Sequence, residues 1–196
     1  MKDLASHIMD IVQNSIRAQA GEIVIRISEN HSDDRFIIEV SDNGTGMDEA
    51  TLSRVRDPFF TSRTVRKVGL GIPLLQQNAE RTGGKLCISS ALGRGTRLTA
   101  CFVHSHLDRP PLGDIAQTLN LLIAANPKLH FVYRHTTDWG DYRLDTDELK
   151  AIFENLPLDH PDIVAAIEEF IRENLKKINA DHSNLYNHKN SNYGKN

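Results

Sequence analysis

Cysteine is scarce in this sequence, and so are the long apolar runs that would indicate a membrane protein. Only Cys87 and Cys101 occur among 196 residues, with no CxxC or Cys/His spacing, so we expect free thiols rather than a disulfide framework. No apolar run approaches the roughly 18 residues of a membrane span. No charged-then-apolar leader opens the sequence. We therefore expect a soluble, cytoplasmic protein without a membrane span.

An excess of positive charge is also missing. The chain has 23 basic and 26 acidic residues, which gives a formal net charge of −3. This balance argues against nucleic acid or an anionic membrane surface as the main partner. The length suits one domain of ordinary size, or one domain with an appendage, and is sufficient for a hydrophobic core.

The pattern of apolar residues predicts an α/β fold. A helix over residues 1–20 ends at Gly21, and alternating apolar residues then indicate a hairpin. The expected strands cover 22–28, 35–41, 85–90 and 96–104, with further helices from Asp48 and over 72–82. Antiparallel strands with helices between them predict a two-layer α/β sandwich.

We expect the chain to divide near a proline-containing stretch. The predicted units are a domain over 1–104, a linker over 105–113 and a small C-terminal α/β or helical unit over 114–179. In that unit the pattern predicts helices over 114–127, 145–157 and 160–178 and a strand over 128–135. Residues 180–196 are polar, without periodicity and rich in Asn, which predicts a disordered tail.

The loop "SDNGTGMDE" (41–49) follows an apolar strand and contains Asp42, Gly44 and Gly46. The glycines allow positive φ angles and a close approach of a ligand to the backbone. A carboxylate repels phosphate, so if the loop binds a nucleotide, Asp42 is expected to face the base.

A polar pair in the first predicted helix is a candidate for the phosphate end. Asp10 and Asn14 are four residues apart and share one face. An Asn oxygen is a suitable Mg²⁺ ligand, and the Asp could hold a water or hydroxyl for attack. The alternative is an ordinary solvated polar face.

Three further motifs are weak individually. "DPFFTSR" (57–63) offers aromatics and basic residues for a lid, or simply core phenylalanines. "KVGLGIP" (67–73) places two glycines at a helix start, where free N–H groups favour an anion. "GRGT" (93–96) leads into the last strand, or is a plain hairpin turn.

In this order the motifs resemble the ATP-binding domain of the GHKL superfamily of histidine kinases, type II topoisomerases, heat-shock chaperone ATPases and mismatch-repair ATPases. "HIMDIVQNS", "DNGTGM", "DPFFTSR", "VGLGI" and "GRGT" resemble its N, G1, F, G2 and last glycine boxes. The pair "DNGTGM" and "DPFFTS" is most similar to the histidine-kinase and anti-sigma kinase branch. The resemblance covers residues 1–104 and implies the Bergerat fold, with a mixed, mostly antiparallel sheet.

The resemblance also implies ligands and roles. The cofactors would be ATP and Mg²⁺, with Asp42 accepting the adenine amino proton, Asn14 binding the metal and Asp10 in the general-base position. Thr96 would support Asp42, and Gly69 and Gly71 would form the lid end over the phosphates. The full set of implied nucleotide-binding residues is Asn14, Asp42, Gly44, Gly46, Met47, Phe60, Arg63, Gly69, Leu70, Gly71 and Thr96.

Three functions remain open at this point. The chain could be a kinase that phosphorylates an unidentified protein partner, a slow ATPase switch, or a non-catalytic nucleotide sensor; a homodimer is also open. "SHLDRPPL" (105–112) resembles the phosphoacceptor box of histidine kinases, but its adjacent prolines disfavour a helix, so we expect a linker there. We expect no phosphoacceptor domain in this sequence and no autophosphorylation on His106.

Overall fold

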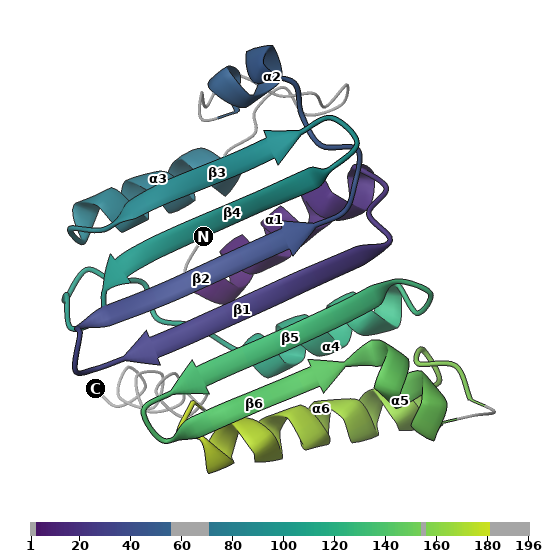
Figure 1. Ribbon diagram of the computed structural model, residues 1–196. Coiled ribbons are helices and arrows are strands. Elements are labelled where there is room, and N and C mark those ends of the chain that lie inside the picture. Colours follow the sequence, from purple (N-terminus) through teal and green to yellow (C-terminus); the bar gives the residue numbers. More distant parts are fainter. Residues whose placement is uncertain (1–2, 56–70, 154–155, 181–196) are drawn as a thin grey trace, which may run out of the picture.

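Six strands form a single sheet in this computed structural model, which describes residues 3–55, 71–153 and 156–180 (Figure 1). Their order in the sheet is β3-β4-β2-β1-β5-β6. The strands are β1 (Glu22–Asn30), β2 (Arg35–Asp42), β3 (Lys85–Ala91), β4 (Gly95–Val103), β5 (His130–Thr137) and β6 (Gly140–Asp145). Only the β1–β5 pair of this described sheet is parallel. The prediction of a mixed, mostly antiparallel sheet is confirmed.

A layer of helices covers one face of the sheet. The helices α1 (Leu4–Arg17), α3 (Gly71–Arg81) and α4 (Ile115–Ala125) lie behind the strands in Figure 1, and α6 (Pro161–Lys177) packs beside α4. Burial alternates along β1, where Ile23, Ile25 and Ile27 face the helices. This period of two buries one face of each strand and produces the predicted two-layer sandwich.

The sheet continues across the predicted boundary at residue 104. Strand β5 pairs with β1 in parallel, and residues 1–104 and 114–179, predicted as separate units, contribute to one hydrophobic core. The predicted linker is packed as well: the carbonyls of Pro111 and Leu112 accept hydrogen bonds from the N–H groups of Leu4 and Ala5 at 2.9 and 2.8 Å. These bonds satisfy free donors at the start of α1.

Strand β6 is the element that the sequence pattern did not predict. It is six residues long and directly precedes the short helix α5 (Thr146–Ile152), with Asp145 as both its last residue and the N-cap of α5. The remaining predicted helices and strands are present, with ends shifted by a few residues, including the short helix α2 (Glu49–Arg54) capped by Asp48. Among the described residues, no helix combines the length and the apolar character needed to cross a bilayer.

Candidate functional site

A cavity of about 400 Å³ lies between α1, the ends of β2 and β4, and the start of α3. This volume is typical of sites for small molecules. Seven of the predicted site residues line it, and they come from five segments of the chain: Asp10, Asn14, Asp42, Gly46, Met47, Gly71 and Thr96. Gly44 lies next to the cavity but does not line it. The predicted residues Phe60, Arg63, Gly69 and Leu70 lie outside the described part of the chain.

Asp42, the last residue of β2, is held by three donors. The Ser15 hydroxyl donates to its Oδ2 at 2.6 Å. The backbone N–H groups of Gly44 and Thr96 donate to its Oδ1 at 2.9 and 3.3 Å. Because hydrogen bonds to an ionised acceptor are strong, the carboxylate is fixed in orientation at the cavity wall.

Ser15 is a site residue that the motif analysis missed. It occupies the inward face of α1, where it is buried among apolar residues. A hydroxyl on an otherwise apolar helical face was the available signal, since a buried hydroxyl requires a hydrogen-bond partner. Its partner is 27 positions away in the sequence, so the contact itself could not be read from the local pattern.

The two glycines of the loop have different structural roles. A Cβ on Gly44 would lie 2.6 Å from the carbonyl oxygen of Ala18, so Gly44 allows the loop to pack against the end of α1. Gly46 has φ +66°, and a Cβ there would lie 2.0 Å from the carbonyl oxygen of Ala91. Both positions require close backbone approach, and the loop is thereby fixed between α1 and the β3–β4 hairpin.

Ser90 is the second residue that the sequence analysis missed. Its hydroxyl accepts a hydrogen bond from the N–H of Met47 at 2.9 Å and donates to the carbonyl of Gly95 at 2.8 Å. It also lies 2.9 Å from the hydroxyl of Thr96. Ser90 therefore connects the glycine loop to the start of β4, the strand that supplies Thr96 to Asp42.

Asp10 and Asn14 lie on the wall formed by α1, as their spacing predicts. Asp10 Oδ2 lies 3.0 Å from the position of a Cβ on Gly71, so the first residue of α3 lies directly against this carboxylate. Asn14 is exposed, and its Oδ1 accepts a hydrogen bond from Arg17 at 2.9 Å. A carboxylate and an amide oxygen on one wall are oxygen donors of the kind that a hard cation such as Mg²⁺ binds, together with phosphate and water.

Two histidines, His7 and His106, are not among the residues that line the cavity. His7 is buried between α1 and α3, where its Nε2 lies 3.1 Å from Nδ2 of Asn78, and burial lowers the pKa of its imidazole. His106 follows the far end of β4 and is not helical. Strand β4 is nine residues long, which is roughly 30 Å of extended chain between the cavity end and His106.

Comparison with known proteins gives the family to which this fold and cavity belong. Residues 2–106 match the model of the family described as histidine kinase-, DNA gyrase B-, and HSP90-like ATPase. The match spans more than half of the chain, and the chain therefore belongs to this family. It contains a histidine kinase-like ATP-binding domain.

Two curated relatives illustrate the similarity. The sensor protein kinase FleS of Pseudomonas aeruginosa is 38% identical over 96 residues, which are 49% of this chain and 24% of that protein. The signal transduction histidine-protein kinase AtoS of Escherichia coli is 31% identical over 93 residues, which are 47% of this chain and 15% of that protein. The chain thus spans less than a quarter of the length of these relatives.

One solved structure has a similar fold over a longer part of the chain than the family match. The N-terminal domain of a DNA repair protein superposes with a TM-score of 0.51 at 18% identity, over 74% of this chain and 52% of that chain. This share exceeds that of the family match, residues 2–106. The shared fold therefore includes part of the chain beyond residue 106.

Proposed function

We propose that this chain binds ATP with Mg²⁺ and transfers the γ-phosphoryl group to a histidine or serine of a separate protein. The observation that carries the proposal is Asp42, a carboxylate fixed by Ser15, Gly44 and Thr96 in the wall of a cavity of ligand size. The same cavity has Asp10 and Asn14 on its α1 wall. These two groups would give base recognition and phosphate chemistry separate places in one site.

The Asp42 carboxylate favours adenine over guanine. An ionised carboxylate only accepts hydrogen bonds, and adenine presents an amino donor where guanine presents a carbonyl oxygen. Its Oδ1 already accepts two backbone N–H groups, so Oδ2 has the acceptor capacity for the base. We expect stabilisation by ATP and ADP and little by GTP.

The α1 wall supplies the phosphate end. Asn14 would hold Mg²⁺ through its amide oxygen, and Asp10 would orient a water or acceptor group. The metal supplies charge neutralisation on the phosphates when bound. Because Asn14 and Arg17 are both exposed, their present hydrogen bond can be exchanged for metal or phosphate contacts at small cost.

Transfer to a separate protein agrees with the position of His106. In the transfer, the acceptor atom forms a bond to the γ-phosphorus while the bond from that phosphorus to the β–γ bridging oxygen breaks and ADP leaves. If the acceptor is a serine, its hydroxyl proton would pass to the Asp10 carboxylate. His106 lies at the end of β4 opposite to Thr96, so it does not face the cavity of its own chain. We therefore infer that the phosphoryl acceptor is on another molecule.

Hydrolysis is the second candidate, because the α1 wall contains a carboxylate at Asp10. A carboxylate can accept a proton from an attacking water, and this residue contacts the start of α3 at the cavity. An ATPase of this kind would act as a conformational switch for its partner. The labelling experiment below distinguishes the two activities.

We predict that the purified chain does not label itself when incubated with γ-labelled ATP and Mg²⁺, and that label appears on a second protein when cell lysate is added. The reason is the distance between His106 and the cavity. Acid-labile label on the chain alone that disappears in His106→Gln would contradict this prediction. Phosphate release without label on any protein would favour the ATPase switch, and neither label nor release would reject both activities.

We predict that Asn14→Ala lowers the ATP affinity measured with Mg²⁺ by roughly tenfold or more, because the contribution of the metal to binding is lost. Any turnover of ATP should be lost as well. ATP binding is measured with Mg²⁺ and with EDTA for both proteins. Gln13→Ala is the matched control, because this amide is adjacent on α1 but does not line the cavity. A variant whose ATP affinity still responds normally to Mg²⁺ would remove Asn14 from the metal site.

A further inference from the structure

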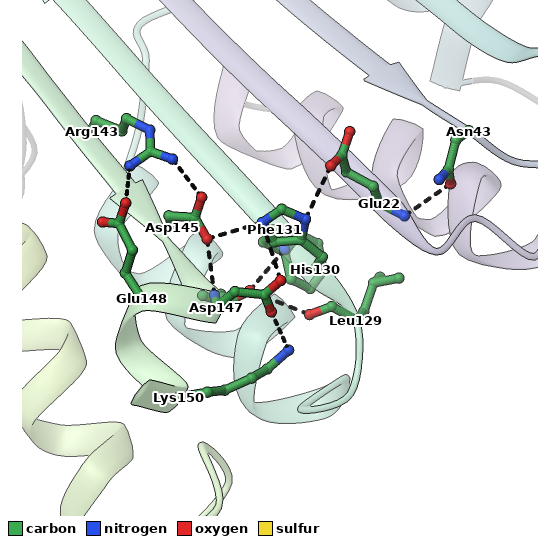
Figure 2. Close-up of polar contacts among 11 residues, drawn as sticks. Glu22, Asn43, Leu129, His130, Phe131, Arg143, Asp145, Asp147, Glu148 and Lys150 are labelled. Atoms are coloured by element: carbon green, nitrogen blue, oxygen red, sulfur yellow. Dashed lines mark hydrogen bonds and ion pairs between the residues drawn. The ribbon is translucent and has the colours of Figure 1, made fainter. Parts of the chain in front are cut away.

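A second group of ligand-type side chains lies where β5 begins, apart from the cavity (Figure 2). It consists of His130, the first residue of β5, and of Asp145 and Asp147 at the junction of β6 and α5. His130 Nε2 lies 2.9 Å from Asp145 Oδ1 and 3.7 Å from Asp147 Oδ2. One ligand atom from each residue lies within 4.8 Å of the others.

We propose that His130, Asp145 and Asp147 bind a divalent transition-metal cation of the Zn²⁺ type. Zn²⁺ takes His nitrogen and Asp oxygen ligands at about 2.0–2.2 Å, and two such ligands at a tetrahedral angle are roughly 3.3 Å apart. The distances of 2.9 and 3.7 Å from His130 Nε2 lie on either side of this value. The third separation, between carboxylate oxygens of Asp145 and Asp147, is within 4.8 Å, so side-chain movements of about an ångström would place all three ligands around one ion.

The other ring nitrogen of His130 has the partner that metal-binding histidines usually have. Glu22 Oε2 lies 3.0 Å from His130 Nδ1, and these two residues are partners in the parallel β1–β5 ladder. A carboxylate on Nδ1 fixes the proton there and directs the lone pair of Nε2 toward the cation. In Figure 2 Glu22 and the two aspartates lie on opposite sides of the ring.

Each aspartate is also held from outside the group. Arg143 donates to Asp145 Oδ2 at 2.5 Å, and Lys150 donates to Asp147 Oδ1 at 2.8 Å. These bonds involve the carboxylate oxygens that do not face His130. All three ligands therefore have outer partners that orient them, which is the arrangement found around bound metals.

The carboxylates on both sides of the His130 ring favour a positive charge at this position. A neutral imidazole has one N–H, yet both ring nitrogens of His130 face a carboxylate, from Glu22 on one side and Asp145 on the other. A lone pair facing a carboxylate oxygen at 2.9 Å is repulsive. The second nitrogen therefore requires either a metal ion or a second proton, and Asp147 gives a metal ion its third ligand.

Zn²⁺ titration of the full chain without nucleotide tests the site separately from ATP binding. We expect one saturable site in calorimetry, a rise in Tm and, with Co²⁺, visible absorption typical of tetrahedral coordination. His130→Gln should lose this site, and so should Asp147→Asn, whose exposed side chain makes misfolding a small risk. Glu22→Gln should bind about tenfold or more weakly.

The matched control is His31→Gln, which removes an exposed histidine from another His/Asp pair, that with Asp138, and should leave the site intact. The chain has nine histidines, so Zn²⁺ could bind weakly at others, and this variant controls for such adventitious binding. Equal Zn²⁺ binding by the unaltered protein, His130→Gln and Asp147→Asn would overturn the proposal. The absence of saturable Zn²⁺ binding would also overturn it. In that case, NMR detection of protons on both ring nitrogens of His130 would identify the group as an ion-pair cluster.

Discussion

Asp42→Asn is expected to abolish measurable ATP binding, with a loss of at least about 100-fold in affinity. Two backbone N–H groups, from Gly44 and Thr96, donate to Oδ1, so the amide oxygen of Asn must take that place. The NH₂ group then replaces Oδ2 beside Ser15. It presents a donor where the amino group of adenine requires an acceptor, and it lacks the charge that strengthens this hydrogen bond.

Calorimetry or a thermal-shift titration with ATP and GTP provides the measurement. Asp48→Asn is the matched control: Asp48 caps α2 by accepting from the N–H of Thr51 at 2.7 Å, and Asn is an equally good N-cap. This control should bind ATP like the unaltered protein. A normal ATP response in Asp42→Asn, or equal stabilisation of the unaltered protein by GTP, would contradict the assignment.

Gly95→Ala is expected to destabilise the fold by more than about 3 kcal/mol and to weaken ATP binding in the molecules that still fold. Gly95 has φ +78°, and a Cβ there would lie 1.9 Å from the carbonyl oxygen of Asp42. The contact is with backbone, so no side-chain rotation can relieve it. The strands β2 and β4 must separate at the point where Thr96 reaches Asp42.

Gly93→Ala separates steric overlap from backbone strain. Gly93 lies in the same turn with φ +70°, but a Cβ there would have open space around it. Strain in the left-handed region alone should cost about 1–2 kcal/mol. The free energy of unfolding in urea is measured for the unaltered protein and both variants. Similar losses for Gly95→Ala and Gly93→Ala would show that the close approach of Gly95 to Asp42 does not contribute to stability.

The sequence alone indicated several of the residues that line the cavity and most of the elements that carry them. Asp10 and Asn14 are one helical turn apart, and Asp42 and Gly46 lie at the end of a strand and in the loop after it. The sequence motifs included all four residues, and in the structure all four line one cavity. The alternation of apolar residues also indicated the hairpin that β1 and β2 form. These features depend on periodicity and local backbone freedom, which a sequence shows directly.

Only the tertiary structure decided which distant segments meet. A period-two pattern predicts a strand but does not name its neighbour, so the parallel pairing of β5 with β1 was not foreseen, although it joins the C-terminal part to the same sheet. The bond from Ser15 to Asp42 and the group around His130 have the same origin. Each contact joins residues far apart in the chain, and their proximity follows from burying one shared core rather than from local preference.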